Sequence, residues 1–240
     1  LYTAYTGMIN EQNRMDIMTN NLANASTVGY KKEGSTSQSF NDVLTVKIKD
    51  QSVGMRNVQK IGIKNPGVKI GDNTYDLALA GDGFFAIEFT NKAGETDTKY
   101  TRAGQFILNK DGYLVTEEGD YVLDTQNRRI RLNTLLDSKI TDDGTIYQND
   151  QAVARIQVTD FEDYDYLEKY GETYYQPIEG AKTTTADAQV KSGYLEMANV
   201  QIVSEMVNLI SITRAYESNQ KVVQTIDGTL DVAANQIGKL

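Results

Sequence analysis

Apolar residues recur at every seventh position near both ends of this chain. They are Leu1, Met8, Met15 and Leu22 at one end, and Ile202, Leu209, Tyr216, Val223, Leu230 and Ile237 at the other. A seven-residue apolar period keeps one seam of a helix facing a partner, because a supercoiled helix has 3.5 residues per turn. The sequence therefore predicts two terminal helices that pair with each other. Periodicity alone is equally consistent with helices buried in an ordinary globular core.

Composition excludes several classes of function. The 240-residue chain has no cysteine. It therefore cannot form a disulfide, and it has neither a thiol nucleophile nor a cysteine-ligated metal site. It also has no histidine, which removes the commonest general base and transition-metal ligand. A formal net charge of -9 argues against nucleic acid, whose binding depends on clustered Lys and Arg.

Hydropathy excludes insertion into a membrane. The apolar stretches are a few residues long, far short of the roughly 20 needed to span a bilayer. Polar residues are scattered from Leu1 to Leu22, unlike the apolar region of a signal peptide. We expect that the general secretory route does not export this protein.

Turn chemistry divides the chain into parts. Asp111-Gly112 and Asp143-Gly144 each separate apolar alternations, and Gly supplies the positive φ that a tight hairpin needs. The sequence predicts an N-terminal helix within 1–30, an extended connector over 31–70, an antiparallel β domain over 71–190 and a C-terminal helix within 191–240. The predicted fold class is α+β. A discontinuous, coiled-coil-like stalk of N- and C-terminal helices carries the inserted β domain.

Parts of the sequence suggest three kinds of chemical site. Gly81-Asp82-Gly83 lacks the Lys of a phosphate loop, so we interpret it as a turn between strands. The acidic run around Asp163 and Asp165 lacks the glycine of a calcium loop, so we interpret it as a solvated edge. No carboxylate pair is singled out for glycoside hydrolysis, although such a pair needs only two residues. We therefore predict no catalytic, cofactor or metal site, with a secreted carbohydrate-binding or hydrolytic β module as the alternative.

Both ends of the chain also carry specific motifs. Asn20-Asn-Leu-Ala-Asn24-Ala-Ser-Thr-Val-Gly29-Tyr30-Lys31 resembles the N-terminal signature of the bacterial flagellar rod and hook family. The segments Gly193-Tyr-Leu-Glu-Met-Ala-Asn199 and Glu205-Met-Val-Asn-Leu-Ile210, with Arg214-Ala-Tyr-Glu217, resemble its C-terminal helix. Gly81-Asp-Gly-Phe-Phe85 and Tyr100-Thr-Arg-Ala-Gly-Gln-Phe106 resemble the β domain of its rod proteins. The resemblance covers most of the chain and fits both proximal and distal rod members.

This resemblance implies a structural subunit of the flagellar basal-body rod, the shaft between motor and hook. It implies export through the flagellar type III apparatus to a site that spans the envelope outside the cytoplasmic membrane. The implied partners are further copies of this chain in a helical tube, other rod proteins, the hook protein and rod-surrounding ring proteins. The residues of the two apolar stripes are the predicted self-assembly positions.

The family motif adds further candidate positions, which are polar or conformationally special. They are Asn20, Asn21, Leu22, Asn24, Gly29, Tyr30, Asn199, Glu205, Arg214 and Glu217. Asparagines at a helix seam can set the register of pairing by hydrogen bonds. The alternative is that they cap helix ends or face water.

Overall fold

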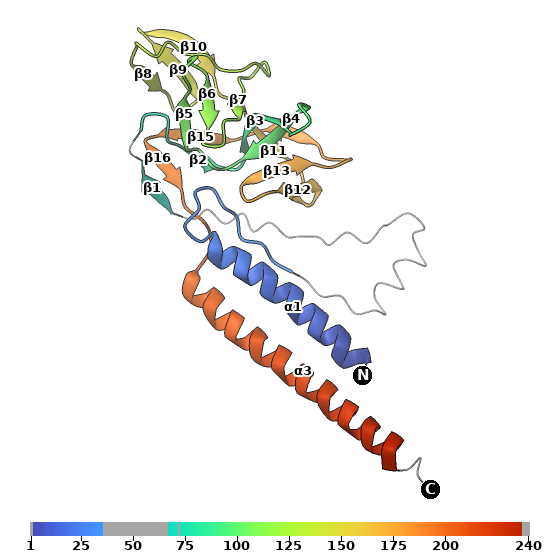
Figure 1. Cartoon of the computed structure of the whole chain (residues 1–240). Helices are drawn as coiled ribbons and strands as arrows, with labels where there is room; N and C mark the ends of the chain where they lie inside the picture. The colour runs from blue at the N-terminus through green and yellow to red at the C-terminus, as the bar shows by residue number, and fades with distance from the viewer. Residues whose placement is uncertain (1, 36–66, 72, 237–240) are drawn as a thin grey trace. The chain divides into compact units, whose positions relative to one another are not determined.

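The chain folds into a helical unit and a β unit (Figure 1). The computed structural model describes residues 2–35, 67–71 and 73–236. The helical unit takes its residues from 1–25, 33–60 and 200–240, and the β unit from 26–32 and 61–199. The predicted α+β class, with an antiparallel β domain inserted between terminal helices, is confirmed.

Two antiparallel helices form the described part of the helical unit. Helix α1 spans Tyr2–Ala23 and lies beside α3, which spans Ile202–Gln236 (Figure 1). Helix α1 ends where Asn24 donates its backbone N–H to the carbonyl of Asn20 at 3.0 Å. Its side-chain amide also donates to this carbonyl, at 3.1 Å, so a polar side chain satisfies the helix end.

Sixteen strands were assigned among the described residues of the β unit, with one short 3₁₀ helix, η1. They are β1 Val68–Ile70, β2 Leu77–Gly81, β3 Phe84–Thr90, β4 Thr96–Thr101, β5 Phe106–Leu108, β6 Leu114–Thr116, β7 Tyr121–Val122, β8 Ser138–Ile140, β9 Thr145–Gln148, β10 Gln151–Arg155, β11 Val158–Phe161, η1 Tyr164–Tyr166, β12 Leu167–Tyr170, β13 Tyr174–Pro177, β14 Thr183–Thr185, β15 Ala188–Ser192 and β16 Tyr194–Glu196. Strands β3 and β4 lie at the centre of the largest sheet, in the order β12-β13-β4-β3-β7-β6-β5.

The β unit extends beyond the predicted range 71–190 on both sides. Strand β1 pairs with β16 in antiparallel register, with Lys69 opposite Leu195. Residues 26–32, expected within the N-terminal helix and the connector, also belong to this unit. Short strands that precede and follow a long insertion pair only in three dimensions, so local pattern did not reveal them. Most of the predicted connector, 36–66, lies outside the described residues.

Both predicted hairpins are confirmed. Strands β5 and β6 pair across Asp111-Gly112, and β8 and β9 pair across Asp143-Gly144. Gly112 has φ +80° and Gly144 has φ +81°, a region that residues with a Cβ rarely adopt. The Asp-Gly signal therefore located these turns correctly.

The apolar core of the β unit has two clusters. The larger one lies around Phe85 and Phe106, whose rings meet edge to face at 5.2 Å. The smaller one is aromatic and lies around Phe84, Phe161 and Tyr175. Successive residues Phe84 and Phe85 point to opposite faces of β3, as strand geometry requires, so this strand contributes to both clusters.

Close packing beside β2 makes Gly104 sensitive to substitution. A Cβ at Gly104 would lie 1.7 Å from the carbonyl oxygen of Leu77, whose N–H donates to the Gly104 carbonyl at 2.9 Å. We expect Gly104→Ala to destabilise the β unit by about 2 kcal/mol or more, because the backbone of β2 must shift. The melting temperature of the β unit, followed by calorimetry, should fall by about 4–8 °C.

Gly228 in α3 provides the matched control. Apart from its chain neighbours and the backbone of its own helix, no atom lies within 4 Å of a Cβ placed there, so Gly228→Ala should leave the β-unit transition unchanged. Equal melting temperatures for Gly104→Ala and the wild type would contradict the packing described here.

Candidate functional site

A seam of alternating four- and three-residue steps marks the face of α3 that lies toward α1. Its members are buried or partly buried: Glu205, Leu209, Ile212, Tyr216, Asn219, Val223 and Ile226. The helices approach closely at Gly7, where an added Cβ would lie 3.1 Å from the side-chain nitrogen of Asn219. Within the helical unit, this seam has the spacing of a coiled coil.

The structure brings only part of the predicted apolar stripes into this seam. Leu209, Tyr216 and Val223 are partly buried in it, whereas Ile202 and Leu230 are 47 % and 58 % exposed. On α1, the predicted positions Met8, Met15 and Leu22 are all partly buried. Leu1 and Ile237 lie outside the described residues.

Two buried polar residues sit at one level of the helical unit. Asn21 and Glu205 are 0 % and 1 % exposed. Each lies fourteen residues from the Gly7–Asn219 level, and antiparallel helices rise equally per residue, so the two are level with each other. The Asn21 amide donates to the backbone carbonyl of Glu33 and accepts from its N–H, both at 2.8 Å. Asn21 therefore holds the returning backbone against the end of α1.

The other motif asparagines bond to a neighbouring side chain or to the backbone of a distant segment. The Asn24 amide donates to the side-chain oxygen of Asn20 at 2.6 Å. Asn199, in the β unit, accepts from the backbone N–H of Lys32 at 2.6 Å. The Asn20–Asn24 contact lies at the end of α1, as expected of capping residues, whereas the Asn199 contact joins two distant segments of the β unit. Arg214 and Glu217 are exposed on α3.

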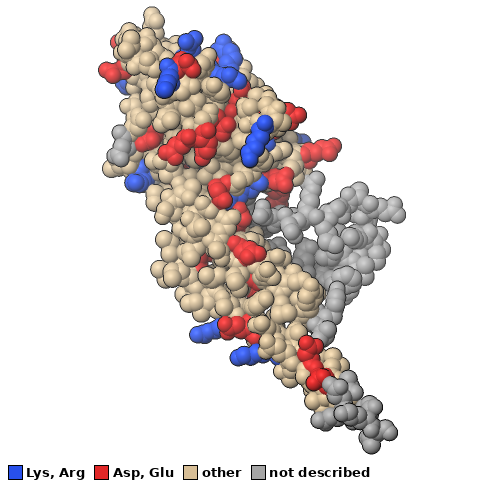
Figure 2. Space-filling view, in the orientation of Figure 1, with Lys and Arg blue, Asp and Glu red and all other residues tan. Residues whose placement is uncertain are grey.

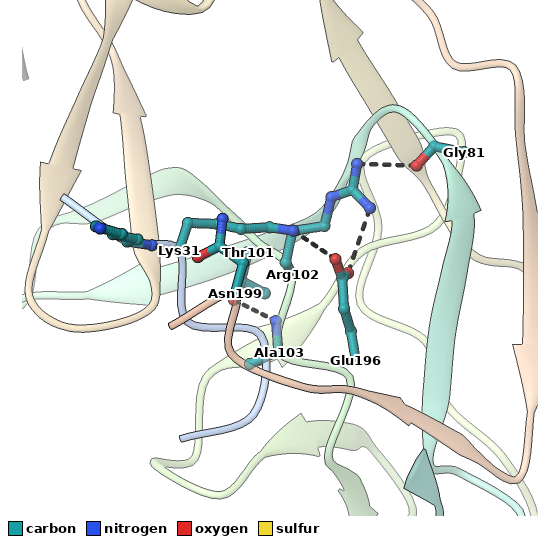
Figure 3. Close-up of polar contacts among 8 residues, drawn as sticks. Lys31, Gly81, Thr101, Arg102, Ala103, Glu196 and Asn199 are labelled. Carbon is teal, nitrogen blue, oxygen red and sulfur yellow. Dashed lines mark hydrogen bonds and ion pairs between the residues drawn. The ribbon is translucent and has the colours of Figure 1, made fainter. Parts of the chain in front are cut away.

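A buried charge cluster joins three distant segments of the β unit (Figure 3). Glu196 in β16 accepts from the Lys31 ammonium at 2.5 Å and from Arg102 Nη1 at 3.3 Å. Arg102 Nη2 donates to the Gly81 carbonyl at 2.9 Å, and its guanidinium lies 5.4 Å from the centroid of the Phe84 ring. The motifs near residues 30, 100 and 196 thus meet around one carboxylate.

Burial controls the electrostatics of this cluster. The side chains of Lys31 and Arg102 are 0 % exposed, and that of Glu196 is 2 % exposed. Burial lowers the pKa of Lys31 although the nearby Glu196 carboxylate favours the charged ammonium. Arg102 Nε is buried without a hydrogen-bond partner. Glu196 is therefore hydrogen-bonded to both buried cations, and the charge of Asp82 also favours the charged form of Lys31.

Gly29 and Tyr30, which precede Lys31, pack closely against other segments of the β unit. Gly29 has φ +70°, and a Cβ there would lie 2.3 Å from the backbone nitrogen of Ala103. Its N–H donates to the Glu196 carbonyl at 2.8 Å. Tyr30 is fully buried, and the Lys169 ammonium lies 3.9 Å from the centroid of its ring. Close backbone approach explains the Gly, and cation–π contact contributes to holding the Tyr.

Sequence reasoning named Gly29, Tyr30 and Asn199 but missed the ionic partnership of Lys31, Arg102 and Glu196. The available signal was that each charged residue sits inside a family-like motif, next to residues that are apolar or small. A single sequence does not reveal which opposite charges meet over such separations. Only the tertiary structure made that pairing visible.

The remaining candidate sites have structural explanations. Gly81-Asp82-Gly83 is the turn between β2 and β3. Asp163 caps η1 by accepting from the backbone N–H of Asp165 at 2.9 Å. Within the described ranges, no three acidic side chains gather as a metal site requires. The described helices also include none that is long and apolar enough to cross a membrane.

Comparison with known proteins gives consistent matches along the chain. The model "Flagella basal body rod protein" matches residues 1–31, "Flagellar hook protein FlgE/F/G D1 domain" matches 78–148, and "Flagellar basal body rod FlgEFG protein C-terminal" matches 191–237. The flagellar basal-body rod protein FlgG of Bacillus subtilis is 33 % identical, over 98 % of this chain and 97 % of its own length. The chain belongs to the flagellar basal-body rod and hook family.

A second relative is equally similar. The rod protein FlgF of Caulobacter vibrioides is also 33 % identical, over 100 % of this chain and 97 % of its own length. The prediction of a structural, non-enzymatic rod subunit in the flagellar basal body is confirmed by this membership. The alternative of a carbohydrate-binding or hydrolytic module is not supported.

In this rod-family chain, we expect Glu196→Gln to destabilise the β unit by about 3–5 kcal/mol. Removing the carboxylate charge leaves Lys31 and Arg102 buried without their counter-ion. Chemical denaturation followed by tyrosine fluorescence would measure the loss. As a control, Asp142→Asn removes the exposed pair with Lys191 and should cost less than about 1 kcal/mol. Equal losses in the two variants would show that the buried cluster has no special role.

Proposed function

We propose that this chain builds the flagellar rod by associating with further copies of itself, and with other rod and hook components, through its helical unit. The observation that carries this proposal is exposed apolar surface on both helices, away from the α1–α3 seam. Side chains at 42–76 % exposure include Tyr5 and Ile9 on α1 and Val203, Met206, Val207 and Ile210 on α3.

The charge distribution supports the same proposal. Between Val200 and Thr213 the one charged residue is Glu205, and it is buried. Figure 2 shows charged side chains gathered over the β unit and sparse over the first turns of α3. Contacts between copies would bury this uncharged, apolar surface. Full burial of one such side chain contributes roughly 1.5–3 kcal/mol.

Assembly would also stabilise the helices themselves. Two paired helices have little interior, and helical stability in proteins comes mainly from packing of an apolar face. Association then orders and buries both helices together. The proposal includes delivery through the flagellar type III apparatus and a rod position that spans the envelope outside the cytoplasmic membrane, both consistent with family membership.

A partner for the β unit is a second element of the proposal. Asp163, which caps η1, and Asp165 within η1 are exposed, as are Glu162 and Glu168 nearby in the chain. An acidic surface favours a partner with complementary basic groups. We propose that this surface, Glu162 to Glu168, contacts a basic face of a protein ring around the rod.

The helical seam tests whether assembly requires an intact pair of helices. We expect Leu209→Asp with Val223→Asp to abolish motility, because two charges would enter the partly buried seam with α1. Swimming in soft agar and electron microscopy of basal bodies would measure assembly. The β unit should keep its wild-type melting temperature, since both substitutions lie in the helical unit.

The control places the same charges on exposed positions of the same helix beyond the uncharged stretch, Gln220→Asp with Gln224→Asp. These variants should assemble. Deletion of the gene should remove hooks and filaments, and a copy lacking residues 1–24 should fail to restore them. Normal flagella in the deletion strain would overturn the proposed function.

The acidic surface makes a separate prediction. We expect Asp163→Lys with Asp165→Lys to weaken co-purification of ring proteins, by reversing two exposed charges. The loss should shrink as salt increases, because exposed charges are screened. Unchanged recovery at low salt would remove the ring contact from the proposal and leave helical assembly untouched.

A further inference from the structure

A hydrogen-bonded cluster around the hydroxyl of Tyr174 joins two parts of the largest sheet. Tyr174 lies in β13, and β4 and β3 separate this strand from β7 in the strand order. Its partners lie at the end of β6 and in the turn that leads to β7: Thr116, Glu118 and Asp120. The Tyr174 hydroxyl donates to Asp120 Oδ2 at 2.8 Å, and its oxygen lies 3.1 Å from Glu118 Oε2. The Thr116 hydroxyl lies 3.2 Å from the same oxygen.

The two carboxylates of this cluster share a single phenol proton. A tyrosine hydroxyl has one proton to donate, and an ionised carboxylate only accepts. When Tyr174 donates to Asp120, its oxygen and Glu118 Oε2 face each other without a proton between them. If Asp120 is protonated, it can donate to the Tyr174 oxygen, and Tyr174 can then donate to Glu118. One added proton therefore turns every contact of the cluster into a hydrogen bond.

The surroundings of Asp120 favour this added proton. Asp120 is partly buried, whereas Glu118 is exposed. In the described part of the chain, neither carboxylate forms an ion pair with a Lys or Arg. Burial raises the pKa of Asp120, and the charge of Glu118 raises it too, which outweighs the hydrogen bonds from Tyr174 and the Thr90 backbone. Burial also raises the pKa of Tyr174, so this hydroxyl keeps its proton.

Another turn of the β unit shows the opposite arrangement. The Asp143 carboxylate accepts from the hydroxyl groups of Thr141 and Thr145 and from the Thr145 backbone N–H. These hydrogen bonds hold the pKa of Asp143 at about 2. Two hydroxyl groups serve one carboxylate in that turn, whereas one phenol serves two carboxylates in the Tyr174 cluster. The first arrangement favours an ionised carboxylate, and the second favours a bound proton.

We propose that the Tyr174 cluster is a pH-sensitive contact, in which a proton bound by Asp120 holds the β6–β7 turn to β13. The cluster lies within the β unit, so this inference goes beyond the proposed assembly and does not depend on it. In the rod position proposed above, outside the cytoplasmic membrane, the β unit would meet the pH of its surroundings. Its largest sheet would then be held together more firmly as those surroundings become acidic.

The direction of the pH dependence follows from the raised pKa of Asp120. A carboxyl group whose pKa is raised on folding binds its proton more tightly in the folded state than in the unfolded state. Its stabilising contribution is complete below the ordinary carboxyl pKa of about 3.9 and is lost as pH rises through the raised value. At neutral pH, the charges of Asp120 and Glu118 therefore oppose the contact with Tyr174.

The variant Asp120→Asn tests the link to stability, because its amide donates where an ionised carboxylate cannot. We expect Asp120→Asn to raise the melting temperature of the β unit in the full chain by about 2 °C or more at about pH 7. The difference from the wild type should shrink toward about pH 4, where Asp120 itself holds a proton. The matched control is Glu117→Gln, which removes an exposed charge from the same turn and should leave the wild-type pH dependence unchanged.

An NMR titration of the side-chain carboxyl carbons in the wild-type chain measures the proton directly. We expect Asp120 to titrate with a midpoint above the ordinary value of about 3.9. A midpoint at or below that value would overturn the proposal. It would also be overturned if Asp120→Asn melted no higher than the wild type at neutral pH. Either result would leave the proposed rod assembly untouched, because assembly is tested in the helical unit.

Discussion

The organisation of the β unit depends on the buried ion pairs made by the carboxylate of Glu196. It binds Lys31, which follows α1 in the chain, and Arg102, which follows β4. The neighbouring bond from the Lys32 N–H to Asn199 then fixes the first and last segments of the unit beside each other. A chain that is inserted between two helices must bring its ends together, and the entropy cost of such closure grows only slowly with length.

Burial makes this arrangement specific. A carboxylate in water could exchange partners, but one that is 2 % exposed beside two buried cations has few other arrangements. Gly29 contributes by letting backbone approach backbone beside Ala103. Gly29, Lys31, Arg102 and Glu196, which belong to three separate motifs of the rod and hook family, therefore meet in one cluster although they are far apart in sequence.

The helical unit differs from the β unit in how its apolar side chains are placed. Its seam between α1 and α3 includes Asn219 and the buried Glu205 among apolar residues, while other apolar side chains such as Val203 and Met206 are exposed. A protein that remained isolated would be more stable with these apolar side chains buried and the polar ones exposed. Apolar outer faces are expected of a subunit whose final environment is other subunits, since exposed apolar patches commonly mark interaction surfaces.

The amino-acid sequence by itself determined the two helices, the inserted antiparallel β domain, the Asp-Gly hairpins and the family. These features depend on the spacing of apolar residues, on turn residues and on contiguous motifs, all of which involve residues close together in the chain. The tertiary structure alone decided which apolar stripe residues join the seam, leaving Ile202 and Leu230 exposed. It also decided the partners of Asn21, Lys31 and Arg102, because a hydrogen bond or ion pair between distant segments depends on how the whole chain closes.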